Sequence, residues 1–465
     1  MHRRSTLLAL PLLLALPLAA PAVAADPPKV FERQLGNGLK VLVKPDHRAP
    51  VLTSQVWYKV GASYEYGGIT GISHLLEHMM FKGTKDHPAG EFSRIVAENG
   101  GEDNAFTGAD YTAYYQNLAA DRLAVSFELE ADRMRNLALN PDDFAKEREV
   151  VTEERRMRTD DDPQSLTGEQ FDAVAFAVSP YRNPTIGWPG DLEQLKAADL
   201  REWYRLWYAP NNATLVVAGD VEPEQVFALA EQYFGPLKAE TVAPPKTQAE
   251  PAQLGEKRLH VKTPAQEPYL LMGYKTPNIA AAAEPWEPYA LEVLSSVLDG
   301  GNSARLEREL VRGSQIASSA SASYSAFGRL SGLFQLDGVP AKGHDIPALE
   351  QALRAQVKRL QDEPVDAAEL ARIRTQLIAN KVYEQDSVFN QAVKLGVLET
   401  VGLGWPLADR YVDSLAAVTP EQVQAVARKY LIPDHLTVAI LDPQPLDGKQ
   451  LKKAPAGLGG HGNVR

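Results

Sequence analysis

Two histidines and a glutamate lie close together within residues 71–81, in the order His74, Glu77, His78. Residues i and i+4 share one face of an α-helix, so both imidazoles are able to reach one cation. Glu77 directly precedes the second histidine and flanks the same position. Two neutral imidazoles and a nearby carboxylate are the groups that bind zinc and accept a proton from water. The spacing therefore predicts a zinc site with Glu77 as its general base.

The alternative for these residues is a histidine pair that is satisfied by structural hydrogen bonds on a buried helix. The order H-x-x-E-H reverses the H-E-x-x-H of many zinc enzymes, and the chemistry of the two orders is the same. A catalytic zinc keeps three protein ligands and leaves one position open for water. An acidic third ligand on another element would therefore decide between the two interpretations.

A second acidic segment offers this third ligand. Asn140 and Pro141 are typical of the first residues of a helix, and we expect a long helix after them. Glu147 and Glu154 lie two turns apart on one face of that helix. Glu153 is the competing ligand, but it lies about 100° round the helix from Glu154. The remaining alternative is a solvated acidic helix face without any ligand.

The two segments together resemble the pitrilysin family of metallopeptidases, which includes insulin-degrading enzyme and the mitochondrial processing peptidase. Its signature is H-x-x-E-H followed further along by E-x6-E. The resemblance implies one Zn²⁺ per chain, with Glu77 as general base, Glu147 in the outer shell, and three ligands, His74, His78 and Glu154.

Residues 100–115 resemble the strand of that family to which an extended peptide substrate pairs beside the zinc. The resemblance implies that the substrate contacts four consecutive residues, Asn104, Ala105, Phe106 and Thr107. Without the zinc motif, the same stretch would be an ordinary half-buried hairpin.

The start of the chain has the pattern of a secretory signal peptide. A basic segment, residues 1–4, precedes an apolar run, residues 7–20, and small residues at 22–25 offer a cleavage site. An uncleaved anchor is the alternative, but the run is short and two prolines interrupt it. We expect residues 1–25 to be removed and the chain to be periplasmic or otherwise exported, without a membrane span.

Length and composition limit the class of protein. The chain has 465 residues, which is too long for one ordinary core, so two domains of about 200 residues are expected. The net charge of −12 argues against a nucleic-acid partner. The chain has no cysteine, so its folding does not depend on disulfides.

The two halves of the chain end alike. Residues 208–217 and 430–438 each follow a predicted helix and open a short strand, which indicates an internal repeat of domain size. The predicted helix at 289–298 is the counterpart of the zinc helix, and it contains no histidine. We therefore expect the second domain to be catalytically inactive.

These observations predict the order of the domains. Residues 238–256 are rich in Pro, Ala, Glu and Lys and lack aromatic residues, as is typical of a linker. The catalytic domain should then occupy 26–237, the inactive homologous domain 257–445, and a disordered tail 446–465.

Strands and long helices alternate in both halves, which predicts an α+β sandwich in each domain. Strands are expected at 31–35, 39–44 and 51–60, the first two joined by a hairpin turn with two glycines. Helices are expected at 91–99, 121–138, 142–158 with a broken continuation towards 177, 198–207 and 223–234. The resemblance narrows the fold class to two homologous α/β sandwich domains of the pitrilysin or processing-peptidase type, which face each other across a peptide chamber.

A pair of residues that the family normally provides is missing. In the family, the second half contributes an arginine and, seven residues later, a tyrosine, which steady the substrate and the developing oxyanion. Counting from Arg305 places Val311 and Ser318 at these positions, and Arg312 is one residue out of register. The resemblance therefore implies a heterodimer, in which a homologous subunit without the zinc motif supplies the pair. A self-sufficient homodimer is the alternative.

The function predicted from the sequence is that of a zinc metalloendopeptidase that cleaves unfolded peptides with metal-activated water. The alternative is a non-catalytic scaffold or chaperone-like subunit of the same fold.

Overall fold

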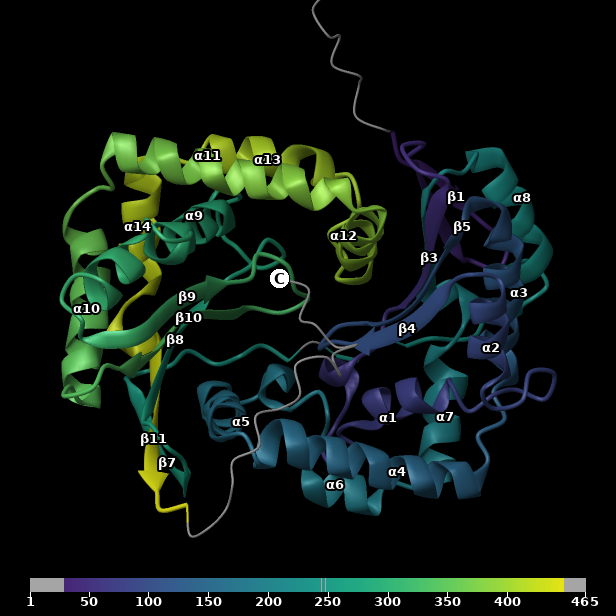
Figure 1. The fold of residues 1–465 in the computed structure, drawn as a ribbon, viewed down its shortest axis with the longest axis horizontal. Helices are drawn as coiled ribbons and strands as arrows, with labels where there is room; N and C mark the ends of the chain where they lie inside the picture. The colour runs from purple at the N-terminus through teal and green to yellow at the C-terminus, as the bar shows by residue number, and fades with distance from the viewer. Residues whose placement is uncertain (1–28, 244, 247, 447–465) are drawn as a thin grey trace, which may run out of the picture.

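The computed structural model describes residues 29–243, 245–246 and 248–446. These residues form two halves, each built on one β-sheet, which face each other (Figure 1). The predicted signal peptide, residues 1–25, lies outside the described residues, and so does the predicted tail from residue 447 onward. Among the described residues, no helix has both the length and the apolar character needed to cross a bilayer.

The first half contains a six-stranded sheet in the order β1-β2-β6-β3-β5-β4. Strands β1 and β2 form the predicted hairpin, and Gly38 in its turn adopts a φ of 90°, which favours glycine. Strand β4 lies at the edge, where it pairs with β5. The bounds are β1 Phe31–Gln34, β2 Lys40–Pro45, β3 Val51–Tyr58, β4 Glu102–Thr107, β5 Thr112–Ala119 and β6 Ala213–Gly219.

Four helices of the first half, α1, α2, α3 and α8, pack against the strands of this sheet, and α4, α6 and α7 pack on other helices. Helix α1 packs against β4 and β5 and is covered in turn by α4 and α7. The main hydrophobic core lies between the sheet and these helices. The bounds are α1 Ile72–Met79, α2 Glu91–Glu98, α3 Leu123–Asn136, α4 Pro141–Arg155, α5 Pro163–Ala175, α6 Pro189–Gln194, α7 Ala197–Trp207 and α8 Pro223–Phe234.

The second half repeats the topology of the first. Its five strands have the order β7-β11-β8-β10-β9, and β7 runs parallel to β11 as β2 runs parallel to β6. The strands are β7 Lys257–Pro264, β8 Tyr269–Thr276, β9 Ala317–Tyr324, β10 Gly332–Pro340 and β11 Leu436–Gln444. The helices are α9 Glu287–Asp299, α10 Ile346–Asp362, α11 Ala367–Tyr383, α12 Val388–Thr400, α13 Leu407–Ala416 and α14 Pro420–Tyr430. The α+β class predicted from the sequence is confirmed.

One helix of each half packs on the sheet of the other half. Helix α12 packs on the inner face of the first sheet, against β2, β3 and β6, and α5 packs on β7, β8 and β11 of the second sheet (Figure 1). At Gly396 of α12 a Cβ would lie 2.1 Å from the ring of Trp57, so only glycine permits this approach. Both sheets are therefore covered on two faces, and the halves interlock.

The segment predicted as a linker connects α8 to β7, and its described residues contain no helix or strand. It nevertheless contacts both halves through Glu250. The carboxylate of Glu250 accepts hydrogen bonds from the backbone N–H groups of residues 177–179 and from Nζ of Lys275 at 2.6 Å.

The broken helix predicted from residue 142 towards 177 is confirmed in three parts. The helix expected at 142–158 ends at Arg155, and a π-helical turn, Arg156–Asp160, follows it. Helix α5 then begins separately at Pro163, because proline disfavours helical geometry in the preceding residue and lacks an N–H. Asp162 caps the new helix by accepting a hydrogen bond from the Ser165 N–H at 2.7 Å.

Candidate metal centre

Helix α1 carries both histidines and is buried along most of its length. Its apolar face packs in the main core through Ile72, Leu75, Leu76 and Met79. His74 and Glu77 are buried as well, with only 4% and 3% of their surfaces exposed. Polar side chains are rarely buried to this extent unless other groups pair with them.

The N-terminus of α1 is capped by a residue that the sequence analysis missed. Gly71 precedes the helix with a φ of 86° and has no side chain to cap the first turn. The buried carboxylate of Glu65 accepts hydrogen bonds from the N–H of Gly71 at 2.7 Å and from that of Ser73 at 2.8 Å. Burial raises the pKa of Glu65 to about 7, although these hydrogen bonds oppose the rise. Glu65 therefore fixes the first turn of the helix that carries the histidines.

His74, His78 and Glu154 bring their ligand atoms within 4.8 Å of one another. The Oε2 atom of Glu154 lies 3.3 Å from Nε2 of His78 and 3.7 Å from Nε2 of His74. Two atoms bound at about 2.1 Å to one tetrahedral zinc ion lie about 3.4 Å apart. The donor types and their separations therefore fit zinc.

The charges around this cluster favour a cation. Burial acts to lower the pKa of His78, but hydrogen bonds with Glu147 and Glu154 outweigh it and raise the pKa to about 9. Burial acts to raise the pKa of Glu154, yet the hydrogen bond with His78 and the nearby imidazoles lower it to about 2. The carboxylates thus stabilise positive charge on the imidazoles, and a divalent ion would displace those protons on binding.

Helix α4 turns Glu154 towards the histidines and Glu153 away from them. As expected, Asn140 caps this helix, and its side chain accepts a hydrogen bond from the Asp142 N–H at 2.9 Å. The side chain of Glu154 is 12% exposed, whereas that of Glu153 is 54% exposed and pairs with Arg156 at 2.5 Å. The geometry therefore favours Glu154 over Glu153 as a ligand.

Glu147 lies on the same face of α4 and contacts the other ring nitrogen of His78. Its Oε1 atom is 3.0 Å from Nδ1 of His78. Its Oε2 atom is 2.5 Å from Nζ of Lys82, a residue that the sequence analysis did not single out. A carboxylate in this position fixes the orientation and tautomer of an imidazole that binds metal through its other nitrogen.

The replacement Glu147→Gln should weaken zinc binding about 10- to 100-fold, because the amide cannot provide the same charge and orientation to His78. The zinc dissociation constant, measured by competition with a chromogenic chelator, checks this. Glu149→Gln on the same helix is the control, since the side chain of Glu149 is 74% exposed. Equal affinities of the two variants would contradict an orienting role for Glu147.

Glu77 contacts the edge strand β4. The hydroxyl of Thr107, the last residue of β4, donates a hydrogen bond to Oε2 of Glu77 at 2.5 Å. Burial raises the pKa of Glu77 to about 7, and the Thr107 hydrogen bond and the charge of His78 oppose the rise. A carboxyl group with a pKa near neutrality is suited to accept and return a proton.

The four residues expected to contact substrate differ in their environment. Asn104 is exposed, whereas the side chains of Ala105 and Phe106 are buried in two different hydrophobic clusters. The Gly108 N–H donates to the Tyr111 carbonyl, so the antiparallel ladder turns the N–H groups of residues 103, 105 and 107 to the open edge. The backbone of Ala105 therefore faces the open edge, where its N–H donates to Oδ1 of Asn104 at 2.8 Å, whereas the backbone of Phe106 pairs with β5.

The residues at the positions of the missing pair lie in the second half. Val311 ends a π-helical turn, and Ser318 lies in β9. Arg305 is buried and pairs with Glu369 at 2.6 Å. Arg312 donates a hydrogen bond to the Asn302 carbonyl and pairs with Glu307 at 3.2 Å. Both arginines are thus engaged within their own half.

Two family models match the chain. The model described as insulinase, peptidase family M16, matches residues 40–188, and the model described as the peptidase M16 inactive domain matches residues 194–377. The segment of this chain that matches the first model, residues 40–188, contains His74, Glu77, His78 and Glu154.

Several relatives are similar over much of the chain. The zinc protease PqqE of Helicobacter pylori is 38% identical over 297 residues, which are 63% of this chain and 66% of that protein. An uncharacterized zinc protease of Mycobacterium leprae is 32% identical over 62% of this chain and 64% of its own. These two matches span just under two thirds of the relatives' lengths. An uncharacterized zinc protease of Mycobacterium tuberculosis is 28% identical, and the match covers 91% of this chain and 95% of that protein.

Solved structures have the same fold. The crystal structure of a protease from Helicobacter pylori superposes with a TM-score of 0.85 at 31% identity and covers 90% of this chain and 100% of that chain. A structure described as the peptidase M16 inactive domain from Pseudomonas fluorescens has a TM-score of 0.80 at 17% identity and covers 90% and 98% of the two chains. The latter shows the fold alone.

Proposed function

Because this chain belongs to peptidase family M16, we propose that it is a zinc-dependent endopeptidase that binds the ion through His74, His78 and Glu154. The observation that carries the proposal is the approach of these three side chains to within 4.8 Å of one another. Relatives that are named zinc proteases support the same conclusion.

The residues around the ion have distinct roles in this proposal. A bound zinc ion supplies Lewis acidity, which acidifies water and polarises the peptide carbonyl. Glu77 accepts the proton of the attacking water and passes it to the leaving amine. The hydroxyl of Thr107 keeps the carboxylate of Glu77 in place, and Glu147 orients the imidazole of His78.

The metal content of the purified chain tests this proposal. We expect about one zinc ion per chain, hydrolysis of an unstructured peptide that a chelator abolishes, and loss of both in His74→Ala. A wild-type chain that binds no metal after incubation with zinc would refute the function.

The open edge of β4 indicates the form of the substrate. Strand β4 ends at Thr107, beside Glu77, so a peptide that pairs with this edge passes the proposed base. Pairing requires a substrate whose own backbone N–H and C=O groups are free. We therefore propose unfolded peptides as the substrate class.

A stable folded domain should be cleaved at least about 100-fold more slowly than an unfolded segment of the same sequence, because only the unfolded segment can pair with β4. Cleavage rates of one protein, in its native form and as a destabilised variant, check this. Equal rates for the two forms would contradict the edge-pairing model.

We propose a heterodimer as the working assembly, since Val311 and Ser318 stand where the missing arginine and tyrosine are expected. The partner would be a homologous chain without the zinc motif. Adding such a chain, ideally one encoded beside this one, should raise kcat for an unstructured peptide by about 100-fold, the effect of restoring one oxyanion donor. Full activity of this chain alone, unchanged by the partner, would leave the homodimer as the assembly.

A non-catalytic scaffold or chaperone-like role is the second candidate function. The observation that favours it is the match of residues 194–377 to a family model described as inactive. Binding of an unfolded peptide without hydrolysis, by a chain loaded with zinc and supplied with its partner, would support this role.

A further inference from the structure

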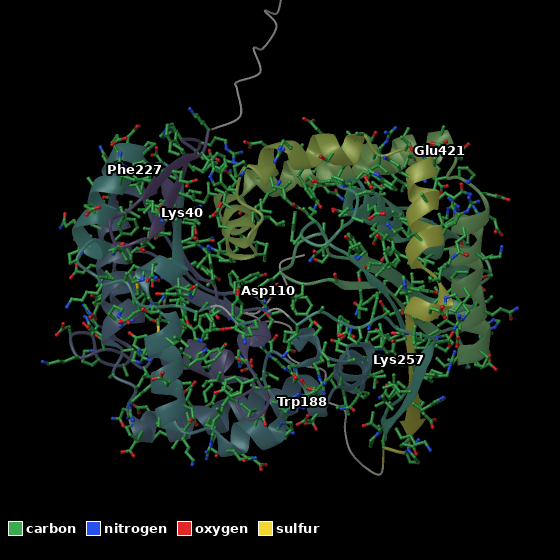
Figure 2. The ribbon with its side chains drawn as sticks, turned by 180° about the vertical axis from the view of Figure 1, so that it is seen from behind. Lys40, Asp110, Trp188, Phe227, Lys257 and Glu421 are labelled. Atoms are coloured by element: carbon green, nitrogen blue, oxygen red, sulfur yellow. The ribbon has the colours of Figure 1, made fainter. Side chains whose placement is uncertain are left out.

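Asp110 lies in the turn between β4 and β5 and has only 4% of its surface exposed. Figure 2 shows it near the middle of the molecule, between the two halves. Its Oδ1 atom accepts a hydrogen bond from the hydroxyl of Ser63 at 2.6 Å, and its Oδ2 atom accepts one from the hydroxyl of Tyr181. Loss of a partner from a buried carboxylate is costly, so these contacts define the position of the turn.

Arg329 connects this carboxylate to the second half of the chain. It lies between β9 and β10, and its backbone N–H donates to Oδ2 of Asp110 at 2.8 Å. Its Nη2 atom donates to the carbonyl of Ser63 at 2.9 Å and to the hydroxyl of Ser63 at 2.8 Å. Its guanidinium group also lies 4.4 Å from the ring centre of Tyr64 and pairs with Asp110 at 3.5 Å. Arg329 thus contacts both the turn and the neighbouring 3-10 segment, Ala62–Tyr64.

The loop that carries Arg329 is itself fixed. The side-chain amide of Asn278 donates to the carbonyls of Gly328 at 2.8 Å and Leu330 at 2.7 Å. The Leu330 N–H also donates to the hydroxyl of Tyr181 at 3.1 Å. Arg329 therefore reaches Asp110 from a rigid part of the second half.

The turn that contains Asp110 leads directly into Thr107. The Gly108 N–H closes the turn on the Tyr111 carbonyl at 2.8 Å, and the Ser63 N–H donates to the carbonyl of Ala109 at 2.7 Å. Thr107 precedes this closed turn, and its hydroxyl contacts Glu77 at 2.5 Å. Any displacement of the turn is therefore transmitted to the hydrogen bond of the proposed base.

We propose that Arg329 is a positioning residue for Glu77. It fixes Asp110 and the turn between β4 and β5, and this turn places the Thr107 hydroxyl against the Glu77 carboxylate. The inference rests on the proposed peptidase function, and it assigns a part in catalysis to the half without the metal motif. Arg329 acts without contacting the substrate or the ion.

Arg329→Gln should lower kcat for an unstructured peptide about 10- to 100-fold, because small displacements of catalytic groups have effects of this size. KM and zinc content should change little, and Arg329→Lys, which keeps the positive charge, should recover most of the loss. Arg258→Gln is the matched control, since Arg258 forms ion pairs with Glu256 and Glu350 inside the second half. An unchanged kcat in Arg329→Gln would overturn the inference.

A double-mutant cycle separates positioning from a general effect on the fold. If Arg329 acts through Thr107, then Arg329→Gln should cost little further activity in a Thr107→Val chain. Independent effects that multiply would show that Arg329 acts by another route, and the inference would be wrong.

Amide hydrogen exchange of residues 104–112 gives a readout that does not depend on activity. Exchange there should be faster in Arg329→Gln than in wild type or Arg258→Gln. Unchanged exchange would also overturn the inference. If the wild-type chain binds no zinc and hydrolyses nothing, the proposed function fails, while the exchange result still decides whether Arg329 fixes the turn.

Discussion

Glu77→Gln should lower the rate of peptide hydrolysis about 10²- to 10⁴-fold and leave the zinc content unchanged. Glutamine has nearly the shape of glutamate, and its amide oxygen is able to accept the hydrogen bond from Thr107, so the fold of α1 is retained. It cannot accept a proton from water at neutral pH, so the activated water loses its base. The loss should lie in kcat, because the ligands of the ion and the edge strand β4 are intact.

Steady-state kinetics and metal analysis on the same preparation check this expectation. Glu98→Gln is a suitable control, because Glu98 is an exposed residue of the neighbouring helix α2 that pairs with Arg94. Near wild-type hydrolysis by Glu77→Gln would refute its assignment as the base. Loss of zinc together with activity would indicate instead that Glu77 binds the ion.

Glu154→Gln should release zinc, and Glu153→Gln should not. The Oε2 atom of Glu154 lies 3.3 Å and 3.7 Å from the two histidine nitrogens, at the separation expected of ligand atoms on one ion. A neutral amide is a poor replacement for an anionic ligand. The zinc affinity of Glu154→Gln should therefore fall by more than the about 100-fold that is typical of outer residues such as Glu147.

The comparison with Glu153→Gln is direct, because the two residues are neighbours on one helix and the same change is made in both. The side chain of Glu153 points to the surface, where it pairs with Arg156, so its replacement should leave zinc affinity and kcat near wild type. Release of zinc by Glu153→Gln, with retention by Glu154→Gln, would reverse the assignment of the third ligand.

The sequence alone predicted those parts of the site that depend on local geometry. The i, i+4 spacing of His74 and His78 places two imidazoles on one face wherever that helix lies in the fold. The spacing of Glu147 and Glu154 in the same way favoured Glu154 over Glu153. The repeat of residues 208–217 at 430–438 predicted a duplication, and the shared strand order of the two sheets confirms it. These inferences were possible because a helix or a repeat imposes a period on the sequence.

Other features were decided only by the tertiary structure. The cap that Glu65 provides for α1, the hydrogen bond from Thr107 to Glu77 and the contact of Arg329 with Asp110 join residues that share no sequence period. The exchange of α5 and α12 between the halves is of the same kind, since an amphipathic helix does not specify which sheet will cover its apolar face. The types and spacing of the residues therefore predicted which groups could hold a metal ion. The packing of the two halves determined how the base and the edge strand are placed beside those groups, because such contacts depend on the whole fold.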